Sequence, residues 1–210
     1  AEGWEDYRLV DSGDGRKLER YGPRLLVRPE PQAMWSPSAP DRWAAADAEF
    51  TGEAEEEGPG RWRTAEGLAE AWAIGCGPAR MTLRLTAFRH VGLFPEQMPH
   101  WEDAAERVRR RAEAGEAPAV LNLFGYTGAA SLILAAAGAR VTHVDASKKA
   151  IAWARENQAA SGLEDRPVRW ICEDAAKFAA REVRRGRRYD GILLDPPKFG
   201  RGPKNETWNL

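Results

Sequence analysis

Three acidic or glycine-rich groups and one Asp-Pro-Pro segment follow four apolar segments in the second half of the chain. They are Gly125-Tyr126-Thr127-Gly128, Asp145, Glu173-Asp174 and Asp195-Pro196-Pro197-Lys198. A glycine turn lets backbone N–H groups approach a ligand closely. A carboxylate about twenty residues later can accept hydrogen bonds from ribose hydroxyls, and a further carboxylate can accept from the amino group of adenine. The joint pattern predicts a site for an adenosine-containing cofactor.

Two classes of cofactor fit such a site, dinucleotides and S-adenosylmethionine. The glycine turn lacks the G-x-G-x-x-G spacing that packs against a pyrophosphate. Pro196 and Pro197 have fixed φ and no backbone N–H, so they stiffen the segment after the last apolar stretch. The Asp195 carboxylate and nearby carbonyls then suit a planar base that carries N–H donors. These features favour S-adenosylmethionine over a dinucleotide.

The segments that must position these residues alternate between strand and helix. We expect strands at residues 119–124, 140–145, 168–172 and 189–194, and helices at residues 101–114, 129–137, 148–161 and 175–185. Short connections between such elements are typical of a parallel sheet with helices on both faces. Ligands of these sheets bind outside the carboxyl ends of the strands, where the four groups stand.

The first part of the chain differs in character. Residues 1–89 read as short strands and turns, including a hairpin around Gly75-Cys76-Gly77-Pro78. Residues 29–60 are rich in proline, glycine and acidic residues, which favours a loop or a partly ordered linker. We therefore predict a β-rich accessory domain over residues 1–89 and a cofactor-binding α/β domain over residues 90–210.

Five motifs of the chain occur in the order and spacing of a known family. They are Gly92-Leu93-Phe94-Pro95-Glu96-Gln97, Asn122-Leu123-Phe124-Gly125-Tyr126-Thr127-Gly128, Val144-Asp145-Ala146-Ser147, Glu173-Asp174-Ala175 and Leu194-Asp195-Pro196-Pro197-Lys198-Phe199-Gly200. With them, residues 90–203 resemble the class I S-adenosylmethionine-dependent methyltransferases that modify bases of bacterial large-subunit ribosomal RNA. These include the cytosine-C5 and guanine-N7 enzymes. The resemblance implies a Rossmann-like sheet and does not single out one target nucleotide.

The resemblance also implies roles for individual residues. Phe124, Gly125 and Gly128 would line the methionine end of the cofactor, Asp145 would bind its ribose and Asp174 its adenine. The segment 92–97 would pass over the cofactor. Asn122 stands where many class I methyltransferases have an acid that orients the methionine ammonium. The remaining residues of the predicted cofactor site are Phe94, Gln97, Tyr126, Thr127, Ala146 and Ala175. Those predicted to face the target base are Asp195, Pro196, Pro197 and Lys198.

Charge is distributed unevenly along the chain, although the formal net charge is −1. Residues 41–60 carry seven acids and one Arg, whereas residues 177–204 carry nine basic and three acidic residues. A basic surface can face a polyanion or be a solvated surface. The cluster 184–188 could bind phosphates or complement a helix C-terminus. Together with the resemblance, this predicts that region 177–204 contacts RNA.

Other classes of protein are disfavoured. No apolar run approaches the roughly 20 residues of a membrane span, and residues 1–30 lack the apolar core of a signal peptide. Two cysteines are too few for a disulfide framework. His90, His100 and His143 lack the spacing of metal ligands, and His143 is expected in the core with one hydrogen bond. A cytoplasmic protein without metal or membrane is predicted, and its oligomeric state is left open.

The function predicted from the sequence is methylation of a ribosomal RNA base. The alternatives are methylation of a protein or small molecule, or cofactor binding without catalysis. Transfer to cytosine C5 requires a cysteine thiolate; we place Cys172 in the core and Cys76 in a hairpin turn, so that thiolate would come from beyond residue 210. The fold that the chain resembles has the strand order 3-2-1-4-5-7-6. Because only four strands are recognisable, we expect a fragment truncated after the fourth.

Overall fold

The computed structural model describes residues 4–52, 60–197, 199–201 and 207–209. The chain forms two compact units. The first consists of Ala1–Cys76 and Thr82–Glu96, and the second of Gly77–Met81 and Gln97–Leu210. The predicted boundary between residues 89 and 90 falls inside the first unit, which runs on to Glu96.

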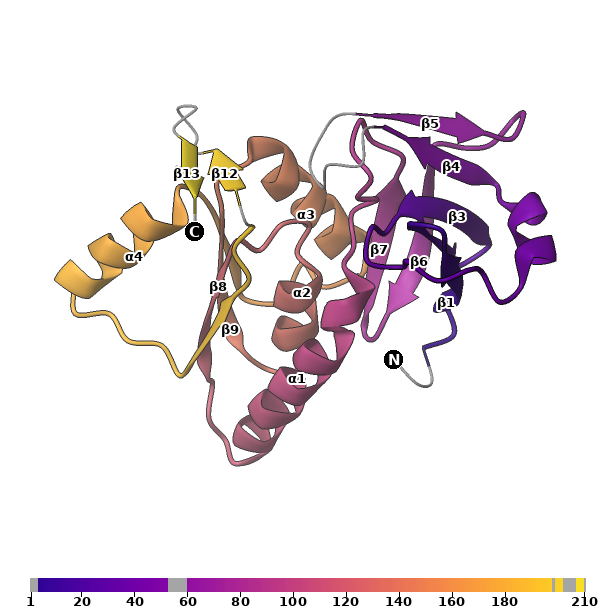
Figure 1. The fold of residues 1–210 in the computed structure, drawn as a ribbon. Coiled ribbons are helices and arrows are strands. Elements are labelled where there is room, and N and C mark those ends of the chain that lie inside the picture. Colours follow the sequence, from indigo (N-terminus) through magenta and orange to yellow (C-terminus); the bar gives the residue numbers. More distant parts are fainter. Residues whose placement is uncertain (1–3, 53–59, 198, 202–206, 210) are drawn as a thin grey trace. The chain divides into compact units, whose positions relative to one another are not determined.

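The first unit contains a five-stranded mixed sheet (Figure 1). Its strands, in order across the sheet, are β1 (Tyr7–Gly13), β2 (Arg16–Tyr21), β3 (Arg24–Pro29), β4 (Ala48–Thr51) and β5 (Arg61–Thr64). Neighbours are antiparallel except β3 and β4, which are parallel. The N-terminal region is therefore β-rich, as predicted.

The acidic segment near residues 29–60 holds more structure than a linker. It contains the short 3-10 helix η1 (Pro40–Ala45) and strand β4. Ala48 and Phe50 are buried while Glu49 and Thr51 are half-buried, which is the period of two that a strand on the edge of a core shows. The prediction of a linker does not hold for η1 and β4. The proline and glycine content was judged over the whole segment, and the strand pattern of alternating burial covers only the four residues of β4.

A buried ion pair lies in the core of the first unit. Arg28 Nε donates to Glu19 Oε2 at 2.7 Å, and the two side chains are 5% and 1% exposed. The hydroxyls of Tyr7 and Tyr21 also donate to Glu19. Burial alone would raise the pKa of Glu19, but the neighbouring Arg28 lowers it below its ordinary value. The carboxylate thus stays charged and partnered, as a buried charge must.

The predicted hairpin is present as β6 (Ala71–Cys76) and β7 (Ala79–Arg84). Gly77 takes a positive φ of 57° in the turn, a conformation that glycine adopts at little cost. Strand β6 extends through Cys76, so this cysteine is a buried strand residue and not part of the turn. The division between the two units falls within the hairpin.

A four-stranded parallel sheet forms the centre of the second unit. Its strands are β8 (Ala119–Leu123), β9 (Arg140–Asp145), β10 (Val168–Cys172) and β11 (Gly191–Leu194). They lie in the order β10-β9-β8-β11, and each neighbouring pair is parallel. In order of appearance this is 3-2-1-4, which agrees with the order implied by the resemblance. A separate pair is formed by β12 (Phe199–Arg201) and β13 (Thr207–Asn209).

Helices cover both faces of this sheet (Figure 1). They are α1 (Met98–Glu113), which follows the one-turn helix η2 (Pro95–Gln97), α2 (Ala129–Ala136), α3 (Lys148–Ala160) and α4 (Ala175–Arg184). Helices α2 and α3 pack on one face, with α1 against α2, and α4 packs on the other. Ser147 caps α3 by accepting from Ala150 N at 3.2 Å, as its sequence position predicted.

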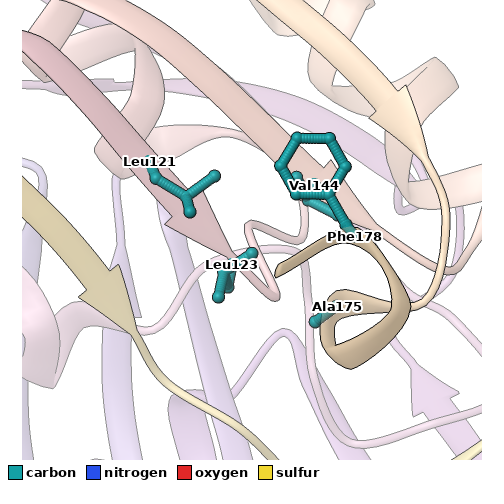
Figure 2. Close-up of a cluster of buried hydrophobic side chains, with 5 residues drawn as sticks. All are labelled: Leu121, Leu123, Val144, Ala175 and Phe178. Atoms are coloured by element: carbon teal, nitrogen blue, oxygen red, sulfur yellow. The ribbon is translucent and has the colours of Figure 1, made fainter. Parts of the chain in front are cut away.

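The core beneath α4 fixes where that helix begins. Figure 2 shows Leu121 and Leu123 from β8, Val144 from β9, and Ala175 and Phe178 from α4 gathered in one cluster. Phe178 and Val144 are fully buried. This packing places the first turn of α4 beside the carboxyl ends of the strands.

Strand β11 lies at the edge of the described sheet. Ile192 and Leu194 pair with Leu121 and Leu123 and share their face of the sheet. They are nevertheless 62% and 61% exposed, because the α4 cluster centres on β8 and β9. The apolar pattern of β11 is that of a strand covered on both faces, and here one face is exposed.

Candidate functional site

The four groups singled out in the sequence lie at one edge of the parallel sheet. Leu194 pairs with Leu123, Leu123 with Val144, and Cys172 with Asp145. The carboxyl ends of the four strands are therefore level with one another. The loops that follow them, residues 124–128, 145–147, 173–174 and 195–197, emerge side by side at the edge where ligands of such sheets bind.

The loop after β8 has an unusual backbone. Phe124 and Tyr126 have positive φ values of 58° and 51°, and Gly128 has 90°. Positive φ is uncommon for residues other than glycine, and such strain concentrates at ligand sites. The loop leads into α2, and no side chain among the described residues caps the N-terminus of this helix. The first N–H groups of this helix are therefore oriented to bind an acceptor.

Buried side chains on the core side of this loop fix its conformation. A Cβ on Gly125 would lie 2.3 Å from Cε1 of His143, and one on Gly128 would lie 3.0 Å from Ala154 and 3.3 Å from Trp170. Only glycine allows the loop to lie this close to the imidazole. Asn157 Nδ2 donates to the carbonyl of Thr127 at 2.9 Å. The loop conformation is thus set by residues of α3, β9 and β10.

Asp145 joins two of the loops. Its Oδ2 accepts from Tyr126 N at 2.9 Å and its Oδ1 from Ser147 N at 2.8 Å. Burial raises the pKa of Asp145 above its ordinary value, although both hydrogen bonds oppose that shift. Each carboxylate oxygen has two lone pairs, so the group can accept further hydrogen bonds. A partly desolvated carboxylate with spare acceptor capacity fits a ligand that brings hydroxyl donors.

Asp174 and its neighbours follow β10. Asp174 is half-buried and caps α4, its Oδ1 accepting from Lys177 N at 2.9 Å. Glu173 makes an ion pair with Arg181, with 2.6 Å between Glu173 Oε2 and Arg181 Nη2.

The two alanines of the predicted cofactor site lie near the same strand end. Ala175 is buried in the α4 cluster, and the carbonyl of Ala146 accepts from Cys172 Sγ at 3.6 Å. Cys172 is exposed, so the prediction that it is a core residue is wrong: it is the last residue of an outer strand.

The segment after β11 reaches the same edge. Asp195 and Pro197 are exposed and Pro196 is half-buried. Lys198, predicted to face the target base, lies outside the described residues. The structure brings Asp195 to the strand edge next to the loop that follows β8. Its predicted role toward a base stays a prediction.

Three predicted cofactor residues have other surroundings. Phe94 belongs to the first unit, where the centroid of its ring lies 4.9 Å from the centroid of the His90 ring. Gln97 belongs to the second unit. Their predicted passage over the cofactor therefore stays a prediction. Asn122 is 5% exposed, and its Nδ2 donates to Ser131 Oγ at 2.9 Å. Sequence reasoning missed Ser131, because a lone polar residue in an apolar helix gives no periodic pattern. It missed Asn157 because that residue lies among the polar residues Arg155, Glu156 and Gln158 of α3.

The basic cluster at the end of α4 is exposed. Arg184, Arg187 and Arg188 are all exposed and have no acidic partner among the described residues, whereas Arg185 pairs with Glu182. In the described part of the chain, no three His, Cys, Asp or Glu side chains are grouped to hold a metal ion. None of the described helices has the length and apolar character needed to cross a membrane.

Comparison with known proteins places this geometry in a family. The model of the S-adenosylmethionine-dependent methyltransferase family matches residues 39–208. The ribosomal RNA large subunit methyltransferase K/L of Shewanella baltica is 35% identical over 131 residues, which are 61% of this chain and 17% of that protein. The protein of the same name from Chromohalobacter salexigens is 31% identical over 152 residues, 71% of this chain and 19% of that protein. The chain thus spans less than a fifth of these relatives.

Solved structures show the same fold. A SAM-dependent methyltransferase from Agrobacterium tumefaciens superposes with a TM-score of 0.93 and 58% identity, covering 99% of this chain and 65% of that one. A protein assigned as a methyltransferase and crystallised with S-adenosylhomocysteine superposes with a TM-score of 0.72 and 21% identity, covering 97% of this chain and 54% of that one. At that identity the second likeness concerns the fold alone.

Proposed function

The chain belongs to the S-adenosylmethionine-dependent methyltransferase family, and from that premise we propose that it methylates a base of ribosomal RNA. The observation that carries the proposal is the likeness to the large-subunit ribosomal RNA methyltransferases K/L. That likeness comes together with an Asp-Pro-Pro segment at the ligand-binding edge of the sheet.

The residues at the strand ends fit the cofactor. We assign the ribose hydroxyls to Asp145, whose carboxylate is partly desolvated and retains acceptor capacity. We assign the methionine end to residues 124–128 and the uncapped N-terminus of α2, where N–H groups suit a carboxylate. Asp174 is assigned to the adenine amino group, since capping of α4 engages one of its oxygens. These assignments use no metal.

The residues after β11 would hold the target base. The sulfonium of the cofactor supplies an already activated methyl group, so alignment of the reacting atoms is the main task left to the protein. Pro196 and Pro197 restrict the backbone beside Asp195. The carboxylate and the neighbouring carbonyls can then accept from the N–H groups of a base. A ring nitrogen such as guanine N7 needs no further base catalyst.

The exposed arginines after α4 would bind the RNA backbone. Arg184, Arg187 and Arg188 have no acidic partner among the described residues, so their charges are available to phosphates. Each phosphate contact of this kind makes binding weaker at higher salt. Substitution of the three by Gln should raise the KM for RNA and flatten its dependence on salt. An unchanged salt dependence would show that these arginines do not contact RNA.

Transfer of a tritiated methyl group from S-adenosylmethionine to ribosomal RNA tests the proposal. Total ribosomal RNA from a strain that lacks the corresponding gene is the substrate, and the same RNA digested to nucleosides is the control. We expect label in the intact RNA and in one modified nucleoside after hydrolysis. Incorporation into protein or into small molecules, with none in RNA, would overturn the RNA proposal and leave the family assignment intact.

A further inference from the structure

A chain of three buried polar side chains runs beneath the loop that follows β8. Asn122 is on β8, Ser131 on α2 and His143 on β9, and they are 5%, 0% and 0% exposed. Asn122 Nδ2 donates to Ser131 Oγ at 2.9 Å, and Ser131 Oγ lies 2.9 Å from His143 Nδ1. Buried polar groups of this kind are costly unless each finds a partner. Three of them at one place require an explanation.

The hydrogen bonds of this chain bear on the tautomer of His143. The amide nitrogen of Asn122 can only donate, so Ser131 Oγ is its acceptor. The hydroxyl hydrogen of Ser131 is then available to His143 Nδ1. Burial lowers the pKa of His143 to about 3, so the imidazole is neutral, and its one proton is on Nε2 when Nδ1 accepts from Ser131.

The ring of His143 lies against the loop that follows β8. Its interaction with the Tyr126 backbone raises the pKa of His143 against the larger effect of burial. Nε2 is buried and has no hydrogen-bond partner among the described residues. The same ring contacts the backbone of Gly125 so closely that no Cβ fits between them. The centroid of the His143 ring lies 4.7 Å from the centroid of the Trp170 ring. The imidazole therefore has little freedom to turn.

We propose that Asn122, Ser131 and His143 are positioning residues, which hold the cofactor loop in its strained conformation through a neutral imidazole protonated at Nε2. Asn122 acts through Ser131 and His143 and does not touch the methionine ammonium. This inference rests on the binding of S-adenosylmethionine at residues 124–128, and it is independent of which RNA is methylated.

A pair of hydroxyl deletions tests the proposal with a matched control. Ser131→Ala breaks the chain below the loop. Thr142→Val removes a buried hydroxyl from the residue that precedes His143. The side chain of Thr142 lies on the other face of the sheet from His143, the face it shares with Leu121, and it makes a hydrogen bond with Tyr189. Both changes should lower thermal stability. We expect Ser131→Ala to weaken S-adenosylhomocysteine binding about tenfold or more, because two buried groups lose their partner. Thr142→Val should change it by less than about twofold.

The tautomer is measured directly in the unsubstituted protein. Nitrogen-15 spectra of the His143 ring at neutral pH should show an unprotonated Nδ1 and a protonated Nε2. This measurement decides the matter even where Ser131→Ala does not fold. A proton on Nδ1, equal losses of affinity in the two variants, or full affinity in Ser131→Ala would each overturn the proposal. If the unsubstituted protein binds S-adenosylhomocysteine but does not methylate RNA, the proposed substrate is wrong and the proposed role of these three residues is unaffected.

Discussion

Two carboxylates, the buried Asp11 in the first unit and the half-buried Asp145 in the second, have opposite surroundings. Asp11 accepts from Trp43 Nε1, Ala39 N, Ser38 N and Ser12 N, and the bond from Trp43 is the main reason that its pKa falls to about 2. Asp145 accepts from two backbone N–H groups, and burial raises its pKa. At Asp11 the hydrogen bonds that stabilise the anion outweigh the effect of burial on the pKa, and at Asp145 burial outweighs the hydrogen bonds.

This difference separates a structural carboxylate from a binding carboxylate. The hydrogen bonds of Asp11 hold the segment that leads into η1 against β1, so its acceptor capacity is used within the fold. Asp145 has capacity left and an anion that the fold leaves partly desolvated. A ligand that donates hydroxyl groups would supply what the fold does not. A carboxylate with a raised pKa at a strand end is therefore a stronger candidate for ligand binding than a buried one with a lowered pKa.

A third carboxylate, Asp195, gives the largest expected effect. It is exposed and belongs to the segment proposed to hold the base. Asp195→Ala should lower methyl transfer roughly a hundredfold or more, as when a contact made in the transition state is lost. Affinity for S-adenosylhomocysteine should stay within about threefold. Equal loss of transfer and of cofactor binding would place Asp195 in the cofactor site or the fold instead.

Alanine substitution of Asp145 and of Asp11 compares the two carboxylates directly. Asp145→Ala should weaken S-adenosylhomocysteine binding by about 1.5–3 kcal/mol, the usual value for a hydrogen bond to a charged group. Asp11→Ala should leave that affinity unchanged while it lowers thermal stability. Isothermal titration calorimetry and thermal melts on both variants measure this. Unchanged affinity in Asp145→Ala would remove that residue from the site.

Acidification should reduce cofactor binding before it reduces stability. Hydroxyl donors favour the charged form of Asp145, so cofactor binding lowers the pKa of this group. Affinity for the cofactor therefore falls as the pH drops through the raised pKa that Asp145 has in the free protein. A raised pKa also means that protonation of Asp145 does not destabilise the fold. Calorimetry from pH 7 downward, with circular dichroism at each pH, should show falling affinity at constant structure. The Asp145→Ala variant should lack this pH dependence.

The smallest expected effect concerns Asp11 and stability at low pH. Its pKa is lowered from 3.8 to about 2, so its stabilising contribution is present above pH 3.8 and is lost as pH falls toward 2. Asp11→Asn should be less stable than the parent at neutral pH, and the difference should shrink across this window. Urea unfolding at several pH values measures it. A constant difference would mean that charge is not what stabilises this carboxyl group.

Much of the second unit could be predicted from the sequence, for local reasons. Several signals in the sequence determine structure within a few residues of where they occur. They are the short apolar runs, the helix caps Ser147 and Asp174, and Gly162 after α3. The level strand ends then follow from parallel pairing. This is why the segments at 125–128, 145, 174 and 195 could be assigned to one edge before any contact was known.

What could not be predicted depends on contacts between distant segments. The partners of Asn122 and His143 come from a helix whose sequence is almost entirely apolar, so Ser131 gave no signal. The exposure of Cys172 follows from the outer position of β10, which the strand's own residues do not reveal. In the first unit, β4 forms by pairing with β3 and β5 and has only a four-residue pattern.

A crystal structure of the protein with S-adenosylhomocysteine tests the central claim most directly. Both ribose hydroxyls should lie within hydrogen-bonding distance of the Asp145 carboxylate, with the adenine beside Asp174 and the methionine end at residues 124–128. The hydrogen bonds of Asp11 should be the same with and without the ligand. A nucleoside bound elsewhere, with Asp145 still bonded only to Tyr126 N and Ser147 N, would contradict the account.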